Sequence, residues 1–232
     1  MEIRRIGRAV LTGTACAGLA LAAAAAGARA QQVAPRVPAG VKLAILPVQD
    51  VTPAPSGAWP GGASSRDDAL GRMNAELDFA LASSEDAAGW MGPRRLTRLV
   101  ERNPMLDVHP RRLAVGRLAE VKPGEGQLRA TLHRQLRRLS ALADVRIVAI
   151  PLRLAWRRPA EDGENGEEAP GAEDAAGSSA RGPGRTVLEL ALVDTRAARL
   201  LWRGEVLGAE GPPGEPGALA SLASGVVELL SP

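Results

Sequence analysis

The sequence predicts an α/β (α+β) fold, a single domain of two or three layers in which helices cover a mixed sheet. Three segments rich in Val, Ile, Leu and Trp follow one another in the last third of the chain, a pattern typical of an antiparallel meander. Elsewhere leucines recur at helical spacing. The expected strands of the meander are 145–156, 186–194 and 199–207. Because only the short connector from Asp194 to Ala198 separates the last two, they are expected to form a hairpin.

The N-terminal part of the domain is expected to add a strand, a long loop and a helix. Residues Val41 to Asp50 are apolar enough for a buried strand over 41–48, stopped near Pro47 because proline has no N–H to donate. The segment from Val51 to Ser65 holds three prolines and three glycines and reads as a loop. Ser65 followed by Asp68 is a capping-box pattern and predicts a helix over 66–83.

Three further helical segments are indicated. Pro93 is placed for the first turn of a helix that runs to Asn103 and ends at Pro104. After a short extended piece from residue 105, a helical turn or two is expected between Arg111 and Glu120. Leucines on one face predict a helix over 127–143, and the apolar spacing after the Gly/Pro-rich break predicts another over 217–230.

Residues 1–30 have the composition of a secretory signal peptide. A basic start precedes an apolar run from Ala9 to Ala26, and Ala28-Arg29-Ala30 supplies small residues at the cleavage positions. We expect a periplasmic or secreted protein, cleaved after Ala30, with 31–40 as an extended lead. The alternatives are an uncleaved membrane anchor and a lipidated Cys16, although the triplet before Cys16 does not match a lipoprotein signal. Membrane association is expected only with one of these two alternatives.

Removal of the signal changes the charge of the chain. Subtracting its four basic residues and one acid from totals of 29 and 26 leaves 25 of each, so the mature net charge is zero and the pI of 9.9 does not describe the mature protein. The single cysteine is lost as well. Stability is therefore expected from the core and not from disulfides.

An acidic insertion interrupts the meander. Residues 159–180 hold seven acids and no base, among many glycines, alanines and prolines, and the surrounding mature chain then sums to plus seven. Such a segment cannot bury apolar surface, so 159–184 is predicted to be disordered within the single domain over 41–230. It is interpreted as a solvated hairpin loop, with docking against arginine-rich faces as the alternative.

No motif identifies a chemistry, and we name no catalytic, cofactor-binding or metal-binding residue and expect no cofactor. His109 and His133 lack metal-ligand spacing and are interpreted as surface or helix-face residues. No G-x-S-x-G elbow is present. Aromatic residues make up 2% of the chain and tyrosine is absent, so no nucleic acid partner is expected.

A glycine-rich loop, Gly57 to Ser65, connects a predicted strand to a helix N-terminus, where a phosphate could bind. It lacks the glycine spacing and the Lys-Ser/Thr ending of nucleotide-binding loops, so it is interpreted as a plain loop with anion binding as the alternative. Asp67 and Asp68 are interpreted as residues that stabilise the start of the following helix.

Three short motifs resemble the N-terminal domain of TolB. They are KLAILPV, LADVRIVAIPLRL and LVDTRAARLLWRGEV, and their order is similar to that in the curli secretion factor and related envelope lipoproteins. The resemblance covers most of 41–230, although the turn at residues 195–198 lacks the usual Thr-Gly. It implies a small α/β domain that binds partners in the cell envelope and is not an enzyme.

The predicted function is therefore an exported, non-enzymatic cell-envelope binding or assembly module whose partner is an unidentified envelope protein. The alternative is an envelope hydrolase or transferase with an unrecognised site, and a structural or carrier protein is a third class. Converging polar groups with perturbed pKa values in a pocket would favour the enzyme. A shallow sheet face or an exposed strand edge would favour the binding module.

Overall fold

The structure, a computed structural model, describes residues 37–38, 40–124, 126–158 and 184–232. The predictions for the signal peptide, most of the lead and the acidic insertion therefore fall outside the described residues. Two ends of those segments are seen. Gly184, which was assigned to the insertion, is the first residue of a strand. Val37, which was assigned to the lead, is buried in the core and donates its N–H to the carbonyl of Leu230.

The centre of the domain is a mixed sheet of five strands, which confirms the predicted fold class. The strands lie in the order β1-β3-β4-β5, and β2 pairs beside β1 with the same neighbour, β3. β1 and β2 run parallel to β3, whereas β3, β4 and β5 form the expected antiparallel meander. Their bounds are β1 Leu43–Ile45, β2 Asp50–Val51, β3 Ile147–Arg157, β4 Gly184–Asp194 and β5 Arg199–Gly211.

The first strand is shorter than the predicted 41–48, and two residues account for its interruption. Pro47 has no N–H, and the N–H of Val48 is taken by the side-chain oxygen of Asn74 at 3.0 Å. The chain stays alongside β3 through single bonds from Leu46 to Ala149 and from Gln49 to Pro151. Pairing resumes as β2, so the predicted strand is split in two.

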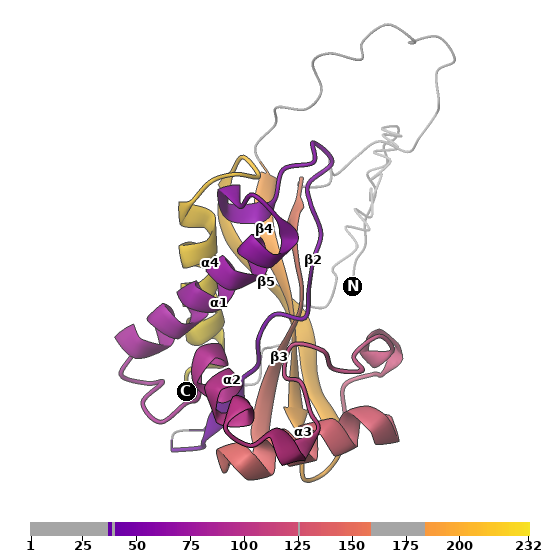
Figure 1. The fold of residues 1–232 in the computed structure, drawn as a ribbon. Helices are drawn as coiled ribbons and strands as arrows, with labels where there is room; N and C mark the ends of the chain where they lie inside the picture. Colours follow the sequence, from indigo (N-terminus) through magenta and orange to yellow (C-terminus); the bar gives the residue numbers. More distant parts are fainter. Residues whose placement is uncertain (1–36, 39, 125, 159–183) are drawn as a thin grey trace, which may run out of the picture. The chain divides into compact units, whose positions relative to one another are not determined.

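Helices cover both faces of the sheet, so of the two predicted arrangements the three-layer one is observed. On one face α1 (Arg66–Ser83) and α4 (Gly217–Leu230) pack on Ile45, Leu188, Leu190 and neighbouring apolar residues. On the other face α2 (Pro93–Glu101) and α3 (Ala130–Ala143) pack on a second apolar cluster that includes Ile150. Figure 1 shows α1 and α4 side by side, to the left of the sheet.

The predicted spans of α1 and α4 are confirmed, whereas the segment between α2 and α3 differs from its prediction. The expected extended piece from residue 105 is a 3-10 turn, η2 (Pro104–Leu106), which begins at the proline that was expected only to end α2. Residues 111–120 form turns and a second 3-10 turn, η3 (Leu118–Glu120). A further 3-10 turn, η1 (Pro60–Gly62), lies in the loop before α1.

The start of α3 is three residues later than predicted because β5 captures the preceding backbone. Gln127 forms an isolated bridge with Arg199, and the N–H of Leu128 bonds to the carbonyl of Ala198 at 2.9 Å. These contacts hold residues 127–128 in an extended conformation. The helix therefore begins at Ala130.

Candidate functional site

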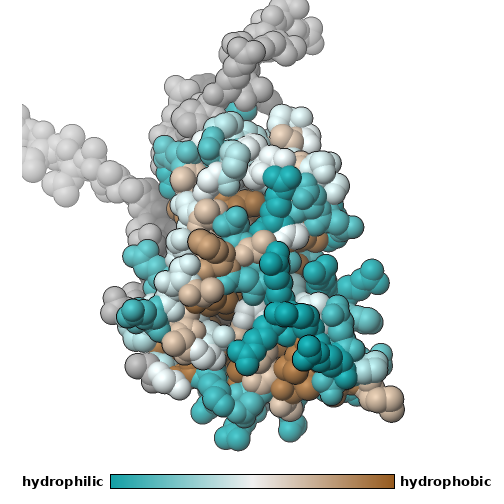
Figure 2. Space-filling view, turned by 60° about the vertical axis from the view of Figure 1, so that its left-hand side comes forward, coloured by the Kyte–Doolittle hydropathy of each residue, from teal (hydrophilic) through white to brown (hydrophobic). Residues whose placement is uncertain are grey.

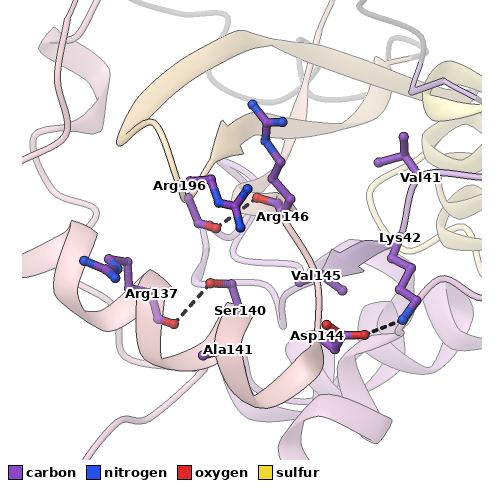
Figure 3. A pocket seen from close by; sticks show the side chains of 10 residues that line it. Val41, Lys42, Arg137, Ser140, Ala141, Asp144, Val145, Arg146 and Arg196 are labelled. Carbon is purple, nitrogen blue, oxygen red and sulfur yellow. Dashed lines mark hydrogen bonds and ion pairs between the residues drawn. The ribbon is translucent and has the colours of Figure 1, made fainter.

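An open cleft of about 600 Å³ lies at one end of the sheet. It is formed where four segments meet: the chain just before β1, the last turns of α3, the start of β3 and the β4–β5 turn. Its lining includes four basic side chains from these segments, Lys42, Arg137, Arg146 and Arg196. Figure 3 shows Lys42 and Asp144 at one end of this basic cleft and Arg137 and Arg196 at the other, with Ser140 between them.

One end of the basic cleft is closed by an ion pair between Lys42 and Asp144. Asp144 follows the last residue of α3 and has a left-handed backbone with a φ of 52°. The hydrogen bond from the Lys42 ammonium holds the pKa of the Asp144 carboxyl below its usual value. Both side chains are largely exposed, so the pair adds little stability.

The buried carboxylate of Asp194 joins the chain at the start of β3 to the β4–β5 turn. Its Oδ2 accepts two hydrogen bonds from the Arg146 guanidinium, at 2.6 and 2.9 Å. Its Oδ1 accepts the backbone N–H groups of Arg196 and Ala197, at 2.9 and 3.0 Å. Burial alone would raise the pKa of Asp194, but these hydrogen bonds outweigh burial and hold the pKa below its usual value. The pair also raises the pKa of Arg146 above its usual value.

Thr195 fixes the turn against its neighbours. Its N–H and its hydroxyl both donate to the carbonyl of Arg146, and its own carbonyl lies 3.1 Å from Nε2 of His133 on α3. The turn that carries Arg196 is thereby tied to both β3 and α3.

The guanidinium groups of Arg137 and Arg196 complete the basic cleft. Both residues are exposed, and neither guanidinium forms an ion pair with a carboxylate of the described residues. Lys42 forms an ion pair with Asp144, and Arg146 forms one with Asp194. Four cations therefore face two carboxylates in this region. The basic cleft therefore presents a local excess of positive charge on an open surface, which suits the binding of an anionic group.

Sequence reasoning did not find this cleft. Its cations lie at residues 42, 137, 146 and 196, and no spacing or periodicity connects them. The resemblance to the TolB N-terminal domain drew attention to the turn at 195–198, but only as a structural feature.

The two histidines lie on different segments of the chain. His109 is exposed on the segment between α2 and α3, and His133 lies on α3 beside the carbonyl of Thr195. Within the described ranges, no three His, Cys, Asp or Glu side chains gather in a metal-binding group. The interpretation of both histidines as surface or helix-face residues is confirmed.

Side chains of the chain itself cap backbone N–H groups at the start of α1. The hydroxyl of Ser65 accepts the N–H of Asp68 at 3.2 Å, and the Asp68 carboxylate accepts the N–H of Ser64 at 2.9 Å, which confirms the predicted capping pattern. The side chain of Arg72 and the N–H of Ser64 lower the pKa of Asp68 to about 2. A carboxylate of the chain itself thus lies at the N-terminus of α1.

Asp78 is the carboxyl group in the described part of the chain whose pKa is raised, mainly by burial. It is on α1, where it accepts the backbone N–H of Arg94 at 3.1 Å. Its side chain therefore caps α2, whose N-cap residue, Gly92, has no side chain to do so. The raised pKa thus belongs to a carboxyl group that caps a helix.

On the face of the sheet that α1 and α4 cover, a shallow groove lies between these two helices. It is lined by Phe79, Ser83, Val227 and neighbouring residues. Phe79 is 69% exposed. Figure 2, which looks toward the side on which α1 and α4 lie, shows small apolar patches separated by hydrophilic residues. No helix among the described residues is both long enough and apolar enough to span a membrane.

No protein-family model matches this chain, and no curated protein does. Among solved structures the chain is similar to a dodecameric PelC variant from Paraburkholderia phytofirmans, with 11% identity and a TM-score of 0.34. The match covers 85% of this chain and 93% of the PelC chain. At this score the similarity carries no argument about function.

Proposed function

We propose that this chain is an exported, non-enzymatic binding module of the cell envelope that recognises an anionic group of a partner protein through the basic cleft. The observation that carries the proposal is the pair Arg137 and Arg196, whose guanidinium groups lie beside two further cations and have no carboxylate partner among the described residues. Guanidinium groups bind carboxylates through paired hydrogen bonds, so an acidic segment of a partner is a suitable ligand.

The ionisation of the basic cleft supports binding over acid–base catalysis. The resolved pKa shifts of Asp144, Arg146 and Asp194 all favour the charged form of the group. General acid–base catalysis instead uses a group that changes its protonation near the working pH. The charges of this cleft are suited to holding a ligand by permanent attraction.

The resemblance to the TolB N-terminal domain is consistent with the proposal. The hairpin of β4 and β5, on which the resemblance depends, is present and pairs from Asp194 with Arg199 outward. The turn that departs from the family pattern, at residues 195–198, is the one that carries Arg196 into the basic cleft. A partner in the periplasm or at the cell surface follows from the expected signal peptide and remains part of the proposal.

The proposal is tested by photo-crosslinking in cells that express the full chain. A photoreactive residue replaces Ala141, which is exposed in the basic cleft, or Ala209, which is exposed on β5 away from it. A discrete crosslinked envelope protein is expected from position 141 and not from position 209. The same product should be lost when Arg137→Gln and Arg196→Gln are combined.

A matched control removes the same charge elsewhere. Arg153→Gln with Arg158→Gln alters two exposed arginines that do not line the basic cleft, and it should leave the crosslink intact. Equal loss of the crosslink in both double variants would contradict recognition by this cleft. Turnover of an envelope substrate that disappears only in the Arg137/Arg196 variant would instead support the hydrolase or transferase alternative.

A further inference from the structure

The two helical layers carry opposite charge. Residues 92–143, which supply α2, α3 and their connection, hold 12 Arg and Lys residues and four acids. Residues 59–91 and 212–232, which supply α1 and α4, hold two basic residues and eight acids. The electrostatic field of the domain is therefore polarised across the sheet, although the mature chain has no net charge.

The outward surface of α2 is mainly basic, with one exposed acid, Glu101, at its last residue. Leu96 and Val100 face the core, while Arg94, Arg95, Arg98 and Arg102 are exposed. The spacing follows helical periodicity, so these side chains share the outer half of the helix.

The outward surface of α3 continues the same basic face. Arg134, Arg137 and Arg138 are exposed. Leu132 and Leu136, also on α3, are buried in the apolar cluster that α2 and α3 share. Arg138 also reaches across to the segment after α2, where its guanidinium donates to the carbonyl of Leu106 at 3.0 Å.

An apolar side chain projects from this basic face. Met105, in the 3-10 turn directly after α2, is 95% exposed, the most exposed large apolar side chain of the described residues. Pro104 beside it is exposed as well. Arg102 precedes Met105 by three residues, and the Arg138 guanidinium reaches the carbonyl of the next residue, Leu106. An exposed apolar side chain beside arginines is the combination with which peripheral proteins enter the interface of an anionic bilayer.

We infer that the basic face formed by α2 and α3 docks on the surface of an anionic phospholipid bilayer. Its arginines would lie at the lipid phosphates, with Met105 inserted between the headgroups. This face shares only Arg137 with the basic cleft, and the inference does not depend on the proposed partner protein. It also does not require a retained signal peptide or a lipidated Cys16. The bilayer is favoured over a soluble polyanion because phosphate attraction alone gives no role to an exposed methionine.

The test measures co-sedimentation with vesicles for residues 31–232, which contain the whole described core. Vesicles of phosphatidylcholine with about one third phosphatidylglycerol are compared with pure phosphatidylcholine. Binding is expected only with the anionic vesicles, and it should be lost at about 0.5 M salt because the charges are then screened. Binding that is equal on both kinds of vesicle would overturn the inference.

Two matched variants locate the surface. Arg95→Gln with Arg102→Gln should weaken binding to anionic vesicles by about tenfold or more, since each basic residue near such a surface contributes substantially. Arg66→Gln with Arg158→Gln removes the same charge from outside the face and should change affinity less than about twofold. Neither pair lines the basic cleft. Equal weakening by both pairs would overturn the assignment of the face.

Met105→Ser separates the bilayer from other anions. It should weaken vesicle binding by about threefold or more and leave binding to heparin, a soluble polyanion, unchanged. If Met105→Ser has no effect on vesicles while heparin binds as tightly as they do, the face binds polyanions and the bilayer proposal is wrong. If molecular mass instead rises at low salt without lipid, the basic face binds the acidic layer of a second copy, which also overturns it.

Discussion

The carboxylate of Asp78 on α1 accepts the backbone N–H of Arg94 at 3.1 Å and so caps α2 from a neighbouring helix. This contact joins the layer that contains α1 to the layer that contains α2. It replaces the side-chain cap that Gly92 cannot supply.

Asp78→Asn should become more stable relative to the parent chain as pH rises. The pKa of Asp78 is raised, mainly because its carboxyl is partly buried, so the folded state favours the neutral form. Its stabilising contribution is therefore fully present below the unfolded pKa and is lost as pH rises through the folded pKa. Asparagine keeps the acceptor oxygen and has no charge to bury.

Urea unfolding of both chains at about pH 4 and about pH 7 measures this difference. Asp78→Ala is the control: it lacks both the acceptor and the titrating carboxyl, so its difference from the parent should shift with pH in the same direction, while it stays less stable than Asp78→Asn by about 1 kcal/mol at both pH values. A difference between Asp78→Asn and the parent that does not change with pH would contradict the assignment.

Gly92→Ala should destabilise the domain by about 1–3 kcal/mol. The added methyl group would overlap Oδ1 of Asp78 and lie 3.1 Å from Cδ1 of Leu81, so either the Asp78 carboxylate would have to leave the N–H of Arg94 or α1 and α2 would have to separate. The φ of Gly92 is −79°, so steric overlap and not backbone strain is the cause. Gly71→Ala is a matched control within α1, since its methyl group would meet nothing within 4 Å. That control should stabilise by about 0.5–1 kcal/mol in thermal or urea unfolding.

Asp194→Asn should destabilise by about 1–3 kcal/mol at neutral pH, because it removes the charge that Arg146 and two backbone N–H groups bind. The pKa of Asp194 is depressed, so its contribution is present above the unfolded value of about 3.9 and is lost as pH falls through the folded pKa. The difference between the two chains should therefore shrink in acid. Asp144→Asn, at the exposed pair with Lys42, should change unfolding free energy by less than about 0.5 kcal/mol.

Ala198→Gly should stabilise the domain by about 0.5–1 kcal/mol. Ala198 has a φ of 55° in the β4–β5 turn, a left-handed conformation that a Cβ atom disfavours and glycine adopts freely. Ala197→Gly is the control, because Ala197 is not among the residues with positive φ and glycine there only adds flexibility to the unfolded chain. Thermal unfolding should rank Ala198→Gly above the parent and Ala197→Gly below it; the reverse order would show that the turn is relaxed as it stands.

Elements with local signals could be predicted from the sequence. The span of α1 follows from Ser65 and Asp68, which satisfy the first N–H groups within four residues of chain. The β4–β5 hairpin follows from two apolar strands and a four-residue connection. In these cases the interactions that decide the structure are made by neighbours in the sequence.

Other features depended on residues far apart in the chain. The end of β1 requires Asn74, which accepts the N–H of Val48, and the late start of α3 requires the β4–β5 turn, where the carbonyl of Ala198 accepts the N–H of Leu128. The basic cleft gathers Lys42, Arg137, Arg146 and Arg196 from segments that the sequence does not relate. By itself the sequence determined the elements and their apolar faces, because hydrophobic periodicity is a local property. Only tertiary structure decided where the charges meet, because exposed arginines obey no periodicity and are placed by the packing of the elements that carry them.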